Sequence, residues 1–423
     1  MGDVFISHSA RGDTYALDVL GRIERGLRER GHRPFVDQDA IPPGEEWRAE
    51  IVDRLVRCDA AVVLINDKAL ASTWVRREVN ILMWRRALGV PLLVIPVLLG
   101  ELRTRDVKLA GLEELGPQQF ARMRSGEPAD AGVLADRVLE RFAALPDGPM
   151  DDDPMSAWLT NLSVYLREAL ASPSHLSRAL KALRMEDKHL GTVTGGHEGC
   201  RFLAHQFLVA PHDRMERALE ALAPSLSDQA ISRLAGALGA TWVSEEAARS
   251  VLPPPGGPPQ AMTLLLNAHF PETAKDYVRR ATCCNHTDYE VKSIGRSLPI
   301  GEDRVGERVR SWTKNVWELF FYVEDEDDRW LPDDLDARRH YLIIDEQQVP
   351  EADFAAAVGL LHEMFSWLIV LVTTGTTPAG PQDRERFANA LLLEPLLTQA
   401  QEQSARRRNK NLARLPERLT GTY

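Results

Sequence analysis

Polar side chains that could bind a ligand follow the first two predicted strands of the chain. His8, Ser9 and Arg11 come just after an apolar stretch at residues 3–7, and Asp37 follows a second one at residues 32–36. If both stretches are strands of one parallel sheet, their carboxyl ends meet at the edge where doubly wound folds bind ligands. Serine and aspartate at strand ends are equally often turn and cap residues. The pattern therefore predicts a binding edge without naming its ligand.

A tryptophan and a carboxylate share one face of a predicted helix. Trp74 and Glu78 lie four residues apart within residues 72–88, and side chains at this spacing are neighbours on a helix. The indole and the carboxylate can therefore line the same pocket. The alternative is a solvated glutamate beside a tryptophan that only packs against the sheet.

The elements that must position these residues alternate between strands and helices. Apolar runs and helical periodicity predict strands at residues 3–7, 32–36, 60–65 and 91–99, with helices at 14–30, 46–57, 72–88 and 132–142. This alternation implies right-handed crossovers and a parallel, doubly wound α/β sheet. Pro91 and Pro96 fit the fourth strand only near its ends or at a sheet edge.

Three ordered segments in this pattern resemble those of the TIR domain. They are Asp-Val-Phe-Ile-Ser-His-Ser at residues 3–9, Asp-Gln-Asp-Ala-Ile-Pro-Pro-Gly-Glu-Glu-Trp at residues 37–47 and Ser-Thr-Trp-Val-Arg-Arg-Glu at residues 72–78. The resemblance covers about residues 1–145 and implies a flavodoxin-like fold. Asn66 departs from it, standing where the family usually has a serine, and the family's third motif is not clear around Phe142.

TIR domains are either scaffolds or enzymes that cleave NAD+ at its nicotinamide glycosidic bond. The enzymes carry a glutamate on the helix after the third strand, often with a tryptophan four residues before it, and Glu78 and Trp74 match that spacing. The resemblance therefore implies that Glu78 is catalytic, with NAD+ as substrate and with no cofactor or metal. A carboxylate there stabilises the oxocarbenium-like cation of glycosidic cleavage. The substrate-binding residues expected from the resemblance are Trp74, His8, Ser9, Arg11, Asp37 and Trp47.

A loop of apolar and small residues follows the second predicted strand: Ile41, Pro42, Pro43 and Gly44. In the family this loop contacts a neighbouring TIR domain and opens or closes the pocket, so the resemblance implies a protein that is nearly inactive until it self-associates. The structural alternative is an ordinary stiff connection. We thus expect an NAD+ hydrolase activated by oligomerisation in bacterial anti-phage defence, or alternatively a non-catalytic TIR signalling adaptor.

Two further regions are predicted beyond a linker at residues 145–154. Apolar residues at spacing three and four predict a helical adaptor at residues 155–250. A proline-rich break at residues 251–259 precedes an α/β region at 260–400, with strands at 262–266, 341–344 and 367–373 and a helix at 354–365. The basic tail at residues 405–411 is predicted to be solvated.

Residues 339–346 and 367–375 resemble core strands of a P-loop NTPase of the STAND type. In such enzymes the strand-end residues, here Asp345 and Glu346, serve the magnesium ion and the attacking water. No Gly-x-x-x-x-Gly-Lys-Ser/Thr occurs in the chain, so the phosphate-binding loop is missing. The expectation is a degenerate, non-hydrolysing sensor or oligomerisation module, and the alternative is a plain packing domain.

The composition excludes several classes of partner and binding site. The 423 residues carry a formal net charge of -11, which argues against nucleic acid as the main partner. Cys58, Cys200, Cys283 and Cys284 include no Cys-x-x-Cys pair, too few for a disulfide framework and poorly spaced for zinc. The longest apolar runs are shorter than the ~20 residues that span a bilayer. We expect a cytoplasmic protein with no membrane contact that self-associates through its TIR and C-terminal regions, in response to a ligand or protein that the sequence does not name.

Overall fold

The computed structural model describes two compact units of the chain. The first comprises residues 1–160 with 191–205, and the second comprises residues 161–190 with 206–423. The description leaves out residues 1, 11, 37–50, 52–53, 88–89, 91, 110–111, 113–114, 116–119, 123–129, 145–153, 186–196, 254–260, 286–288, 297–298, 300, 324–334, 336–337, 348–350, 376–378, 380–386, 388–389 and 421–423. The predicted division into domains 1–145, 155–250 and 260–400 stays a prediction.

The first sheet consists of parallel strands, which are β1 (Asp3–Ser7), β2 (Arg33–Val36), β3 (Ala60–Ile65) and β4 (Leu93–Leu98). Their order in the sheet is β2-β1-β3-β4. Every residue of β3 is buried, as expected for a strand whose two faces are both covered. Pro96 lies in β4 at the edge of these described strands, where a missing N–H is tolerated. The predicted doubly wound α/β fold is confirmed.

Helices cover both faces of this sheet. On one face, α1 (Thr14–Glu29) and α6 (Ala131–Glu140) pack their apolar residues against β1 and β3. On the other face lie α3 (Asp67–Ala71) and α4 (Thr73–Ala87), whose Val75, Val79 and Leu82 join the core. Shorter helical segments are α5 (Thr104–Leu109) and η2 (Arg141–Ala144). Most of the predicted helix at 46–57 lies outside the described residues.

The middle of the chain is helical, as predicted. Its segments are α7 (Pro154–Leu166), η3 (Arg167–Ala171), α8 (Pro173–Ala182), α10 (His197–Val209), α11 (His212–Leu222), η4 (Ala223–Ser225), α12 (Asp228–Leu238) and α13 (Glu245–Arg249). Helices α8, α11 and α12 each show an apolar side with a buried leucine row, which is the pattern of amphipathic helices packed on one another.

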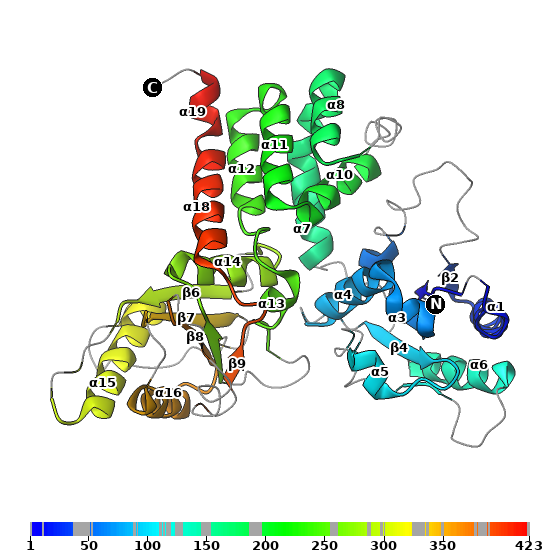
Figure 1. Ribbon diagram of the computed structural model, residues 1–423, viewed down its shortest axis with the longest axis horizontal. Coiled ribbons are helices and arrows are strands. Elements are labelled where there is room, and N and C mark those ends of the chain that lie inside the picture. Colours follow the sequence, from blue (N-terminus) through cyan, green and yellow to red (C-terminus); the bar gives the residue numbers. More distant parts are fainter. Residues whose placement is uncertain are drawn as a thin grey trace. The chain divides into compact units, whose positions relative to one another are not determined.

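The second unit contains another parallel sheet. Its strands are β5 (Met262–Leu266), β6 (Tyr289–Ile294), β7 (Arg339–Asp345), β8 (Leu368–Thr373) and β9 (Ala390–Leu392), in the order β6-β7-β8-β5-β9. Helix α14 (Pro271–Ala281) lies on one face (Figure 1). On the other face, α15 (Arg304–Val316), the π-helical turn η5 (Trp317–Phe321) and α16 (Ala352–Met364) form an aromatic-rich core with the strands.

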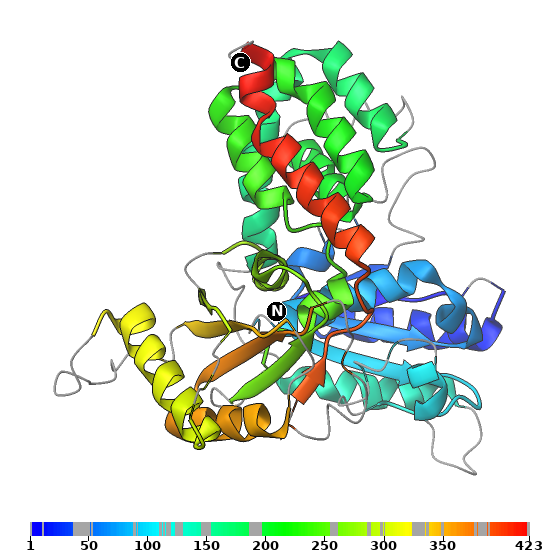
Figure 2. The same ribbon diagram turned by 60° about the vertical axis from the view of Figure 1, so that its left-hand side comes forward.

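The C-terminal tail, predicted to be solvated, is a helix whose basic residues are mostly exposed while one narrow side is buried. Helices α18 (Gln399–Ala413) and α19 (Leu415–Thr420) run alongside α11 and α12 (Figures 1 and 2). Glu402, Ala405 and Leu412 are buried on one side of α18, because their spacing of three and seven residues places them on a common helix face. This buried side was not predicted, because the arginines of the tail at residues 405–411 outnumber its apolar residues.

Candidate functional site

The carboxylate of Glu78 lies against the carboxyl end of strand β1. Glu78 is on α4, and its Oε2 accepts a hydrogen bond from Ser7 Oγ at 2.5 Å. Ser7 is the last residue of β1, so the central strand and the helix after β3 meet at this contact. The Glu78 side chain is only 2% exposed. A short hydrogen bond to a carboxylate in a buried setting is a strong interaction that fixes the carboxylate's orientation.

His8 and Ser9 continue from β1 at the same edge of the sheet. His8 is buried, and its Nδ1 accepts a hydrogen bond from the N–H of Ala10 at 3.3 Å. The carbonyl of Ser9 accepts a hydrogen bond from Asn66 Nδ2 at 3.2 Å. The loop after β1 is thus held to the end of β3 by side chain and backbone contacts.

Asn66 organises this edge, although it was noted in the sequence only as a departure from the family pattern. Its Oδ1 caps α3 by accepting from the N–H of Ala69 at 2.9 Å, and its Nδ2 also donates to Asp13 Oδ2 at 2.9 Å. The N–H of Ala16 and the Asn66 amide together lower the pKa of Asp13 below its ordinary value. A serine could cap the helix but could not reach both partners of the amide.

Trp74 and Glu78 have different surroundings although both project from α4. Trp74 is half-buried and packs against the apolar cluster on the α3–α4 face of the sheet. Glu78 instead reaches Ser7 at the strand end. Packing of the indole fixes the first turns of α4 and hence the position of the carboxylate one turn later. Arg11, Asp37, Trp47 and the loop Ile41, Pro42, Pro43 and Gly44 lie outside the described residues.

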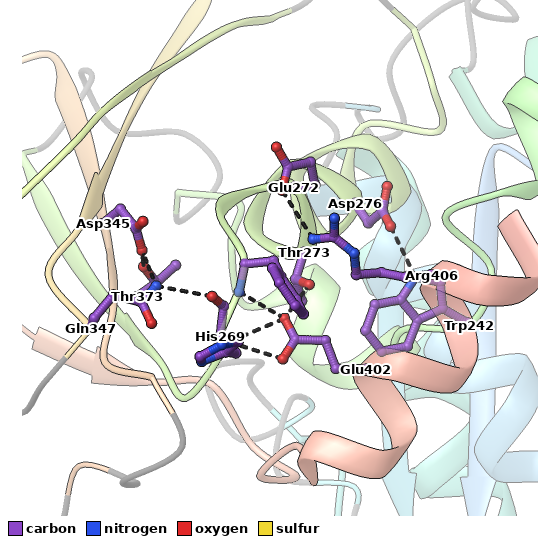
Figure 3. A network of polar contacts seen from close by, with 11 residues as sticks. Trp242, His269, Glu272, Thr273, Asp276, Asp345, Gln347, Thr373, Glu402 and Arg406 are labelled. Carbon is purple, nitrogen blue, oxygen red and sulfur yellow. Dashed lines mark hydrogen bonds and ion pairs between the residues drawn. The ribbon is translucent and has the colours of Figure 1, made fainter. Parts of the chain in front are cut away.

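A second set of polar residues lies at the carboxyl edge of the second sheet, shown in Figure 3. Asp345, at the end of β7, accepts hydrogen bonds from Thr373 Oγ1 at 2.7 Å and from the Gln347 amide. Gln347 Nε2 also donates to the carbonyl of His269 at 2.9 Å. Glu346 is buried and lies 3.6 Å from Arg296 Nε. Both acidic residues at this strand end are therefore engaged with side chains of the chain itself.

The thiol of Cys284 is not an activated nucleophile. Burial raises the pKa of Cys284 to about 12, so its thiol stays protonated at neutral pH, whereas reactive cysteines have a lowered pKa. Among the residues that the structure describes, no cluster of three or more His, Cys, Asp or Glu side chains is suited to hold a metal ion. Of the described helices, none has both the length and the apolar character needed to cross a bilayer.

Comparison with known proteins bears on the first unit. The family model of the TIR domain matches residues 4–135. The TIR domains in a solved structure of "the activated Roq1 resistosome directly recognizing the pathogen effector XopQ" are similar to this chain at 19% identity, covering 34% of this chain and 99% of that chain with a TM-score of 0.28. No curated protein matches the chain.

Proposed function

We propose that this chain, which carries a TIR domain at residues 4–135, is an NAD+ hydrolase that cleaves the bond between nicotinamide and ribose. The observation that carries the proposal is the placement of Glu78 on the helix after β3, fixed by Ser7 at the carboxyl end of β1. Parallel α/β sheets bind ligands at that edge. NAD+ is the substrate in this proposal. Among the described residues, Trp74, His8 and Ser9 are the candidates to contact it.

The proposed chemistry needs one carboxylate. Cleavage of the glycosidic bond leaves an oxocarbenium-like cation on the ribose, which the negative charge of Glu78 stabilises as it develops. The bonding electrons leave with nicotinamide, which departs as a neutral molecule, so no general acid is required. A water molecule then forms the new bond to the anomeric carbon and loses a proton to solvent, which gives ADP-ribose. Ser7 acts as a positioning residue, because its hydroxyl fixes one carboxylate oxygen.

The enclosure of Glu78 supports a regulated enzyme. A carboxylate that is 2% exposed cannot contact a dinucleotide until neighbouring groups move. Self-association through the loop of Ile41, Pro42, Pro43 and Gly44 is the event that we propose to uncover it. Such an enzyme suits a cytoplasmic immune effector of bacteria, including antiviral defence, in which C-terminal regions receive the signal.

The test is release of nicotinamide from NAD+ by the concentrated full chain, with Glu78→Gln as the variant. A positioned acidic group contributes ~10²–10⁴ to a rate, so we expect a loss in that range. Glu140→Gln is the matched control, since Glu140 is an exposed glutamate of α6 in the same domain. Equal rates for the wild type and both variants would remove Glu78 from the mechanism.

The second candidate is a non-catalytic TIR adaptor that assembles through the same loop. The burial of Glu78 against Ser7 also fits a carboxylate that only ties α4 to β1. An adaptor predicts no nicotinamide release at any protein concentration, while its assembly remains intact. The same assay therefore separates the two functions.

For the second sheet we propose a sensor or oligomerisation module resembling a STAND domain without its phosphate-binding loop. Strand β7 ends in Asp345 and β8 ends in Thr373, side by side in the sheet. The sequence between β5 and α14 is Asn-Ala-His-Phe at residues 267–270, which lacks the glycines and lysine of a phosphate loop. This module would respond to a signal without hydrolysing a nucleotide.

A further inference from the structure

A buried carboxylate from the C-terminal helix lies at the start of α14. Glu402 of α18 is 1% exposed, and its oxygens accept hydrogen bonds from the N–H groups of His269 at 2.9 Å and Phe270 at 3.0 Å. Thr273 Oγ1 donates to the same carboxylate at 2.5 Å. Figure 3 shows His269 and Thr273 beside the carboxylate of Glu402. Glu402 and its donors are more than 120 residues apart in sequence, so these hydrogen bonds join the C-terminal helix to a distant part of the chain.

The start of α14 is electrostatically suited to an anion. It follows β5, an inner strand of the parallel sheet, and helix N-termini carry partial positive charge and free N–H groups. Phe270 occupies the N-cap position and has no side chain that can cap, while Pro271 at the next position lacks an N–H. Glu402 therefore supplies from a distant helix the negative charge and the acceptors that local residues lack.

Further contacts hold the beginning of α18 against the same loop. The guanidinium of Arg406 stacks on the Phe270 ring at 3.6 Å, and its Nη1 pairs with Glu272 at 3.2 Å. Just before α18, the Asn267 side chain exchanges two hydrogen bonds with the backbone of Leu397, at 2.6 and 2.9 Å. The first turns of α18 are thus attached to the sheet edge by contacts grouped around Glu402.

The other half of α18 is attached to the helices of the same unit. Arg408 Nη1 pairs with Glu216 of α11 at 2.7 Å, and Asn409 Nδ2 donates to the carbonyl of Gly239 at 2.9 Å. Helix α18 therefore bridges the sheet and the helical part of the second unit, with Glu402 as its buried contact on the sheet side.

We propose that α18 is a releasable latch, in which Glu402 acts as an internal anion that holds the C-terminal helix on the start of α14. The closed latch covers the edge of the second sheet at which doubly wound folds bind ligands. Release of α18 uncovers that edge and uncouples the sheet from the helices. The latch is a property of the second unit and does not depend on NAD+ cleavage.

Hydrogen exchange of the full chain tests the latch. In Glu402→Ala and Glu402→Gln, we expect amides of residues 399–413 and of the first turn of α14 to exchange about 10- to 100-fold faster, while β7 and β8 keep their protection. Gln403→Ala, an exposed neighbour on α18, should leave every segment unchanged. Sodium acetate should restore part of the protection in Glu402→Ala, whereas sodium chloride at equal ionic strength should not.

Two results overturn the latch. Unchanged exchange of residues 399–413 in both Glu402 variants would mean that the carboxylate does not hold the helix. A uniform rise in exchange across β7, β8 and α18 would mean that Glu402 is only a part of the common core. The outcome is independent of nicotinamide release, so a negative result here leaves the proposed NAD+ hydrolase untouched, and the reverse also holds.

Discussion

At the scale of single residues, the hydrogen bond between Ser7 and Glu78 stabilises a buried carboxyl group and fixes its orientation. Burying a carboxylate is costly unless hydrogen-bond donors replace water. The hydroxyl of Ser7 is one such donor at 2.5 Å. The same bond fixes the orientation of the carboxyl group between a strand and a packed helix, and the proposed enzyme would use this fixed orientation for electrostatic stabilisation.

A double-mutant cycle in urea denaturation measures this contact without reference to activity. Ser7→Ala should cost about 1–3 kcal/mol, because the carboxylate stays buried with one donor fewer. In the Glu78→Gln background the same substitution should cost less, since a neutral amide is easier to bury. We expect a coupling energy of about 1 kcal/mol or more. Additive effects would show that the two side chains do not depend on each other.

Residue spacing placed Trp74 and Glu78 on one helix, but it indicated neither their different surroundings nor Ser7 as the partner of Glu78. Ser7 was part of a recognised segment, yet only the parallel register of β1 with β3 brings that strand end to α4. The role of Asn66 could not be predicted for a similar reason. Its amide donates hydrogen bonds to Ser9 and Asp13, which lie 57 and 53 residues away in the sequence. Long-range partners of this kind depend on register, which a single sequence does not contain.

At the scale of elements, strands covered on both faces were predictable, and so were the edge strands β2 and β4 of the first sheet, but the two edge strands of the second sheet were not. Strands β3 and β8 are buried at every residue and stand out as continuous apolar runs. Strand β6 has the sequence Tyr-Glu-Val-Lys-Ser-Ile and is partly exposed at one edge, and β9 has only 3 residues at the other. Their polar or short sequences carry little β signal, so the extent of the second sheet was missed.

A histidine of helix α16 should make the stability of the second sheet depend on pH. Burial lowers the pKa of His362, on the last turn of α16, from 6.5 to about 4, even though a helix C-terminus favours a positive charge. The unfolded chain binds this proton near its ordinary pKa, so stability from the neutral ring is complete above about pH 6.5 and is lost as pH falls toward 4.

The variant His362→Leu should therefore flatten the acid side of the stability curve. Between about pH 7 and pH 4.5 the wild type should lose up to about 3 kcal/mol more than the variant. Urea denaturation at a series of pH values measures both curves. If they run parallel, the ring is protonated equally easily in the folded and unfolded chain.

At the scale of the whole molecule, the proposed enzyme combines the enclosed carboxylate of Glu78 with a C-terminal region that we propose controls assembly. Glu78 is enclosed in the first unit, and α18 closes the second unit through Glu402. Activity would then depend on association of copies, which changes the surroundings of Glu78 without altering the fold of the sheet.

The decisive measurement is the rate of nicotinamide release per chain over a range of protein concentrations, with sedimentation to report assembly. It tests directly whether Glu78 cleaves NAD+ once copies of the chain associate. If the chain is an NAD+ hydrolase activated by assembly, the rate per chain rises with assembly in the wild type and stays at background in Glu78→Gln, although that variant assembles equally well. A fully assembled wild-type protein that releases no nicotinamide would contradict the enzyme and leave the adaptor.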